Sequence, residues 1–190
     1  MRSRKPARMS TFLDWMPDAA TQAALADLQH GIRAAVPADA PRHDWRTPAQ
    51  WHMTLRYLGE SIHDSQHKRI DAAMQAFASQ APAVEASLVG VQYWPHARVL
   101  VAKIDASDAL KALLKQLETS MQGCGFAKER TQTAHVTLAY LPRDARPPAL
   151  PEVAFPATLL HIDRIHLLRT MPGAYMSHAS WPLAGASTDA

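Results

Sequence analysis

The chain has 190 residues, of which 47% are hydrophobic and 19% are charged, as expected for a globular protein with one substantial domain. A single cysteine, Cys124, excludes an internal disulfide framework and a zinc site built from several cysteines. The formal charge of +3 is compatible with an anionic ligand but is too small to identify one.

The two ends of the chain differ in composition from the rest. Residues 1–8 carry four basic side chains without the apolar stretch of a secretory signal, so we expect a basic disordered tail there. Residues 184–190 are small and polar, and we expect a second flexible tail. No apolar run of about 18 residues or more occurs, so we expect no membrane partner and a cytoplasmic location.

Between these ends, apolar periodicity predicts a mixture of helices and strands. Asp18 is placed to cap the first helix. The expected elements, in chain order, are a strand at 9–15, helix at 19–35, strand at 51–58, helix at 61–79, strands at 84–93 and 98–104, helix at 105–122, and strands at 135–141, 159–169 and 175–182. The strands at 84–93 and 98–104 are expected to form a hairpin. The pattern predicts an α+β fold with largely antiparallel pairing.

The most informative feature of the sequence is a duplication. Residues 52–58 and 135–141 both read His-x-Thr-Leu-x-Tyr-Leu and align without gaps, at an offset of 135 − 52 = 83 residues. Two similar halves would suit a pseudo-twofold arrangement with one motif strand from each half side by side. A single His-x-Thr would indicate little, because a lone strand histidine is usually structural, but two equivalent copies favour function.

Strand geometry gives the motif a meaning, because alternate side chains point to opposite faces. The histidine and threonine of each copy therefore share one face, and the following leucine points to the core. Continued alternation predicts that Arg56 lies on the face of His52 and that Tyr57 and Tyr140 pack in the core. Two such strands would present two imidazoles and two hydroxyls to a common cleft.

On these motifs the chain resembles the two-histidine (2H) phosphoesterases, specifically the RNA 2′,3′-cyclic phosphodiesterases, also called 2′-5′ RNA ligases. The resemblance extends from about Met9 to Leu183. It also includes the segment that follows the first motif, the Trp94-Pro95 corner, and the closing Tyr175 and Trp181-Pro182-Leu183. It implies one bilobal domain over residues 9–183, in which antiparallel sheets with outer helices are pseudo-twofold symmetric around a central cleft.

The resemblance also implies a reaction: opening of an RNA 2′,3′-cyclic phosphate to a 2′-phosphomonoester, together with reversible 2′-5′ RNA ligation. It assigns His52 as the general acid and His135 as the general base, an order that the near-identical motifs do not fix. Thr54 and Thr137 would bind the phosphate oxygens, and Arg56 and Arg130 are further candidates for substrate binding. A surface salt bridge is an equal alternative for Arg56.

The expected partners and cofactors follow from the same resemblance. RNA ends or nucleoside 2′,3′-cyclic phosphates are the expected partners, no metal or other cofactor is expected, and the chain is expected to act as a monomer. Which RNA or nucleotide is the physiological substrate stays open.

Some positions depart from the family pattern. The family often has a proline before the second histidine and an arginine two residues after its leucine, where this chain has Ala134 and Tyr140. Arg143 is one possible substitute for that arginine. Asp14 is an unusual residue within the opening strand, and Trp94 is either buried or free to stack on a base.

Two rival functions are weighed against this interpretation. One is a non-catalytic nucleotide-binding or RNA-binding module with the same fold. The other is a metal hydrolase that uses some of the ten histidines. His161 and His166 would then be candidate ligands, but on one strand at a spacing of five they would face opposite sides.

Overall fold

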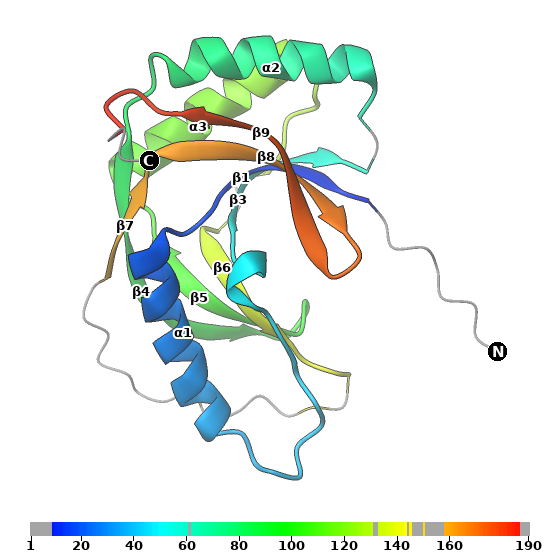
Figure 1. Cartoon of the computed structure of the whole chain (residues 1–190), viewed down its shortest axis with the longest axis vertical. Coiled ribbons are helices and arrows are strands. Elements are labelled where there is room, and N and C mark those ends of the chain that lie inside the picture. The colour runs from blue at the N-terminus through cyan, green and yellow to red at the C-terminus, as the bar shows by residue number, and fades with distance from the viewer. Residues whose placement is uncertain are drawn as a thin grey trace, which may run out of the picture.

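Two antiparallel sheets form the framework of the protein, as a computed structural model of residues 9–60, 62–130, 133–143, 145, 150 and 158–186 shows (Figure 1). The first sheet has the order β3-β1-β8-β9, with β1 at Thr11–Trp15, β3 at Met53–Gly59, β8 at Arg164–Met171 and β9 at Ala174–Pro182. The second has the order β2-β6-β5-β4-β7, with β2 at Asp44–Trp45, β4 at Val84–Trp94, β5 at Val99–Asp105, β6 at His135–Tyr140 and β7 at Thr158–Ile162. The α+β class, the antiparallel pairing and the β4–β5 hairpin are thereby confirmed.

Three α-helices and a 3-10 turn complete the described residues: α1 at Ala19–Ala34, η1 at Pro48–Gln50, α2 at Asp64–Ala78 and α3 at Asp108–Gly123. Asp18 caps α1 as predicted, because its carboxylate accepts a hydrogen bond from the Thr21 amide at 2.7 Å. The third helix starts three residues later than expected. The Ser107 hydroxyl accepts from the Leu110 amide at 3.1 Å, and this cap fixes the beginning of α3.

The two motif strands are related by matching irregularities in register. On β3, Arg56 pairs with Leu13 of β1 and Thr54 pairs with Asp14, so Leu55 is an extra residue. On β6, Ala139 pairs with Leu100 of β5 and Thr137 with Val101, so Leu138 is extra. Both motifs therefore contain a β-bulge at the same leucine. This correspondence supports the pseudo-twofold relation and makes Val101 the counterpart of Asp14.

A change of sheet at Asp163 was not predicted. Residues 159–169 were expected to form one strand, but β7 pairs with β4 of the second sheet and β8 pairs with β1 of the first. The break lies at Asp163, whose carbonyl accepts a hydrogen bond from the Leu183 amide at 2.7 Å. His161 and His166 consequently belong to different sheets. The short strand β2 was also missed, because a two-residue strand beside prolines carries no periodic signal.

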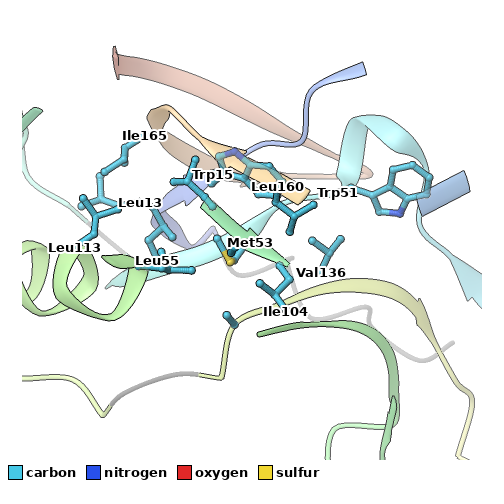
Figure 2. Close-up of a cluster of buried hydrophobic side chains, with 14 of the residues drawn as sticks. Leu13, Trp15, Trp51, Met53, Leu55, Ile104, Leu113, Val136, Leu160 and Ile165 are labelled. Carbon is cyan, nitrogen blue, oxygen red and sulfur yellow. The ribbon is translucent and has the colours of Figure 1, made fainter. Parts of the chain in front are cut away.

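One hydrophobic core joins the two halves. Trp15, Met53 and Leu55 from the first sheet meet Val136 and Leu160 from the second (Figure 2). Helices α2 and α3 lie together and contact β9 and β3 respectively, whereas α1 lies beside β7 (Figure 1). Because β3 and β6 contact one another across the two sheets, both motifs are held at the same junction.

The flexible tail expected at residues 184–190 was wrong for its first residue. Ala184 was placed in a flexible tail, yet its amide donates to the Ala81 carbonyl at 2.8 Å and its carbonyl accepts from Ala83 at 3.0 Å. The expected tail at residues 1–8, and residues 187–190, lie outside the described part of the chain. No helix within the described part is long and apolar enough to span a membrane.

Candidate active site

The two motif histidines are held in the same way. His52 Nδ1 lies 2.9 Å from the carbonyl oxygen of Gln50, and His135 Nδ1 lies 2.7 Å from that of Thr133. In both cases the acceptor is two residues earlier in the chain. Since a carbonyl can only accept, each Nδ1 must carry a hydrogen, which leaves Nε2 as the nitrogen that can exchange a proton with a substrate.

Both imidazoles are half-buried and each has an aromatic ring against it. The ring of Tyr175 on β9 lies edge-on to His52 with centroids 4.4 Å apart, and the ring of Trp94 on β4 lies 4.5 Å from His135. Trp94 is thus half-buried, between the two alternatives considered from the sequence. Each imidazole is therefore packed against one aromatic ring.

Burial lowers the pKa of both histidines, and the bonds from Nδ1 to the carbonyls partly oppose that effect. For His52 the charges of His135 and Arg46 lower the pKa further. Strand β3, which follows His52, and strand β6, which carries His135, contact one another. A common cleft for the two imidazoles stays a prediction.

The threonines of the two motifs are half-buried at equivalent positions, with Thr54 opposite Asp14 on β1 and Thr137 opposite Val101 on β5. On β6 no bulge separates Thr137 from His135, so the predicted sharing of a face by these two residues agrees with the register. His52 lies one residue before β3, outside the paired residues, so the shared face of His52 and Thr54 stays a prediction.

After the threonine, the bulge reverses the alternation and overturns the predicted positions of three residues. Tyr57 was expected in the core but lies with its ring 5.2 Å from Phe12, whose ring is 6.4 Å from His52. Tyr140 is likewise 43% exposed instead of buried. Arg56 was expected beside His52, but it is 6% exposed and points away from it.

The guanidinium of Arg56 is occupied by internal partners. It forms ion pairs with Glu118 of α3 at 2.6 Å and with Glu129 at 3.0 Å, and it donates to the carbonyls of Tyr57 and Ala127. These contacts tie β3 to α3 and to the segment before the second motif. The arrangement is neither the phosphate contact nor the surface salt bridge considered from the sequence, and it favours a structural role.

Arg130 lines a cavity to which Arg56 also contributes. This cavity of about 830 Å³ is lined by Thr54 and Arg130 together with side chains that include Lys103, Lys128 and Glu118. Neither motif histidine lines it. Arg130 is exposed and shares this cavity with Thr54, so of the two arginines predicted to bind substrate it is the one that stays at the surface near a motif residue.

Arg46 is a residue of the site that the sequence did not reveal. Its guanidinium carbon lies 5.4 Å from the centre of the Tyr140 ring, and its charge acts to lower the pKa of both Tyr175 and His52. Its backbone is fixed to β6, because its amide donates to the Leu138 carbonyl at 2.8 Å. Arg46 follows a proline-rich stretch without any motif, so no pattern could have identified it.

The buried side chain of Gln29 supports this part of the site from helix α1. Its amide nitrogen donates to the carbonyls of Arg46 at 2.8 Å and Leu138 at 3.0 Å. The carbonyl of the bulge residue thus accepts two hydrogen bonds, which satisfies the backbone group that the bulge leaves unpaired. Arg143, the possible substitute for the family arginine, is exposed in the segment after β6.

The described residues contain no arrangement that suits the rival metal site. Within the described ranges, no three side chains of the His, Cys, Asp or Glu types are grouped so that they could hold a metal ion. His161 is exposed on β7, 3.4 Å from Glu85, whereas His166 is half-buried on β8 in the other sheet.

Comparisons with known proteins bear on the family and on the fold. The family model described as the 2′-5′ RNA ligase superfamily matches residues 17–173. The crystal structure of TT0787 of Thermus thermophilus is similar with a TM-score of 0.75 at 22% sequence identity, covering 94% of this chain and 100% of that chain. Escherichia coli LigT complexed with 3′-AMP gives 0.68 at 19% identity, covering 93% and 98%. The MHV ns2 PDE domain gives 0.54 at 14% identity, covering 85% and 99%. At these identities the structural likenesses establish the fold alone.

Proposed function

We propose, from the premise that the chain belongs to the 2′-5′ RNA ligase superfamily of two-histidine phosphoesterases, that it hydrolyses 2′,3′-cyclic phosphates at RNA ends or on nucleosides to 2′-phosphomonoesters. The same site would form a 2′-5′ linkage when the 5′-hydroxyl of a second RNA, in place of water, attacks the phosphorus and the 3′-oxygen leaves. The observation that carries this proposal is the matched pair of imidazoles, each with Nδ1 bonded to a carbonyl, at the junction of β3 and β6.

The proposed reaction is an in-line displacement at phosphorus. His135 Nε2 takes a proton from the attacking water as the new P–O bond forms. The bond between phosphorus and the 3′-oxygen breaks, and His52 Nε2 donates its proton to that oxygen. Thr54 and Thr137 donate hydrogen bonds to the non-bridging oxygens, where negative charge increases. Positioned acid–base groups of this kind contribute about 10²–10⁴-fold each.

The charges around the site suit an anionic substrate. Arg46 is a cation whose charge acts on His52, and we assign it to the phosphate in place of the family arginine that Tyr140 replaces. A bound phosphate would oppose the effect of Arg46 on His52 and favour the protonated imidazole that a general acid requires. Arg130, on the cavity that adjoins Thr54, is assigned to a neighbouring phosphate of a longer RNA.

The test is the product formed from a nucleoside 2′,3′-cyclic phosphate and from an RNA with a cyclic 3′ end. We expect a 2′-phosphomonoester from the wild type, and a loss of at least about 10²-fold in kcat for His52→Ala and His135→Ala. If the assigned order is right, His52→Ala removes the alkaline limb of the pH–rate profile and His135→Ala removes the acid limb. A 3′-phosphomonoester product would contradict the assigned leaving group.

Two controls separate the rival functions. Binding of nucleotides without turnover anywhere between pH 5 and 8 would favour the non-catalytic module. Loss of activity in a chelator, with recovery on addition of a divalent metal, would favour the metal hydrolase. Catalysis by the two histidines predicts turnover that a chelator leaves unchanged.

A further inference from the structure

Asp14 is a carboxyl group enclosed beneath the candidate active site. It lies on β1 between Thr54 of β3 and His166 of β8, and it is 0% exposed. On this strand Leu13 and Trp15 join the hydrophobic core, so the intervening Asp14 points to the opposite face. That face also carries Phe12, whose ring is 6.4 Å from His52.

The surroundings of Asp14 do not suit a charged carboxylate. Neither oxygen makes a hydrogen bond of good geometry to a described residue. Burial raises the pKa of Asp14 well above its usual range, and only the nearby Thr54 hydroxyl opposes this. Among the titratable groups nearby, His166 of β8 pairs with Asp14, and burial favours its neutral form by lowering its pKa. Tyr175 of β9 is a group whose pKa is raised by burial, and Asp14 helps to raise it. Burial therefore favours the neutral carboxylic acid form of Asp14, which has one hydrogen to donate.

The second half of the protein shows that the fold does not need this group. The counterpart of Asp14 is Val101, which pairs with Thr137 and is also 0% exposed. A buried polar group without good partners costs stability, and an apolar side chain of similar size avoids that cost. A carboxyl group lies beside one motif threonine, whereas a valine lies beside the other. This difference points to a role of Asp14 in the site.

We propose that Asp14 is a positioning residue for the reaction assigned above, in that its carboxyl O–H donates to Thr54 Oγ1 and thereby directs the Thr54 hydroxyl hydrogen toward the phosphoryl group. A threonine hydroxyl has one hydrogen and two acceptor positions. While its oxygen accepts from Asp14, its own hydrogen must point elsewhere. Thr54 thus becomes a fixed donor, whereas Thr137, beside Val101, remains free to rotate. This inference rests on the proposed function.

The test compares Asp14→Asn with Asp14→Val, which copies the second half. Asparagine keeps an uncharged donor, so its kcat should stay within about threefold of wild type. Valine removes the donor, so kcat should fall about tenfold with little change in KM. The free energy of unfolding in urea should meanwhile rise for Asp14→Val, because a poorly bonded polar group is replaced by an apolar one. A merely structural residue would lose stability instead.

A double-mutant cycle identifies the partner of Asp14. In a Thr54→Val background, Asp14→Val should have no further effect on kcat, whereas in a Thr137→Val background the tenfold loss should persist. The proposal is overturned if Asp14→Asn is as slow as Asp14→Val, if Asp14→Val turns over like wild type, or if the two backgrounds respond equally.

A readout without turnover keeps this proposal separate from the proposed function. A wild type that opens no 2′,3′-cyclic phosphate overturns the assigned reaction, whatever Asp14 does. The affinity for inorganic phosphate, measured by calorimetry, then tests the positioning of Thr54. We expect weaker binding for Asp14→Val and near wild-type binding for Asp14→Asn, and equal affinities in the three proteins would refute the role of Asp14.

Discussion

The halves around β3 and β6 are alike in their backbones and different in their surroundings. In both halves the histidine Nδ1 is hydrogen-bonded to the carbonyl oxygen two residues earlier in the chain. In both, a threonine lies two residues after the histidine, and a bulge lies at the next leucine. Their neighbours differ: Asp14 corresponds to Val101, and Arg56 to Ala139. The proposed chemistry needs the shared features in both halves. The differences place a buried carboxyl group and a buried guanidinium group in the first half only.

The largest effect outside the histidines is expected at the two threonines. Thr54→Val and Thr137→Val should each lower kcat/KM for a 2′,3′-cyclic phosphate by about 10²-fold, because each removes one hydrogen-bond donor to a charged oxygen. Thr→Ser at the same positions restores the donor and should recover most of the rate. Steady-state kinetics measure this, and a threonine whose valine variant is fully active would show that only one half contributes a donor.

The duplication made this symmetry predictable, since identical motifs indicated which residues share a face as far as the threonine. Beyond the threonine, the bulges reverse the faces on which Arg56, Tyr57 and Tyr140 lie. The bulges could not be predicted, because an extra residue in a strand leaves no mark in its apolar pattern. Arg46 was missed for a different reason. Its position depends on a bond from its backbone to β6, a contact between residues far apart in the sequence.

The next expected effect concerns stability. Arg56→Ala makes the first half resemble the second, and it leaves Glu118 and Glu129 without their buried cation. These carboxylates are partly exposed, which reduces the penalty, so we expect a loss of about 2 kcal/mol in the free energy of unfolding. Turnover below the unfolding transition should change little. Lys111→Ala, which removes an exposed pair with Asp108, is the matched control and should have a much smaller effect.

A smaller effect is expected at Arg46, whose charge acts on His52. Arg46→Met should lower kcat/KM about tenfold by removing a charged contact to the phosphate. It should also raise the pKa of His52, because one of the charges that disfavours the imidazolium is gone. The pH–rate profile of the free enzyme should therefore move toward alkaline pH. Arg42→Met, at an exposed position on the same segment, should leave both the rate and the profile unchanged.

The smallest effect is a dependence of stability on pH. Burial lowers the pKa of His52 and of His135 in the folded protein, so below the unfolded value of about 6.5 the unfolded chain binds more protons. The stability that these neutral imidazoles contribute is present above that pH and is lost as the pH falls through the folded values. Urea unfolding from pH 7.5 to 5 should show a decline that His52→Gln and His135→Gln each reduce. An unchanged slope in both variants would show that other groups cause it.

The central claim is that the two histidines, 83 residues apart by 135 − 52, act together on one phosphate. The most direct measurement is kcat for His52→Gln, His135→Gln and the double variant with one 2′,3′-cyclic phosphate. Residues that act as a unit are strongly non-additive, so each single variant should lose at least about 10²-fold and the double variant hardly more. Losses that multiply in the double variant, or a single variant with near wild-type turnover, would contradict the claim.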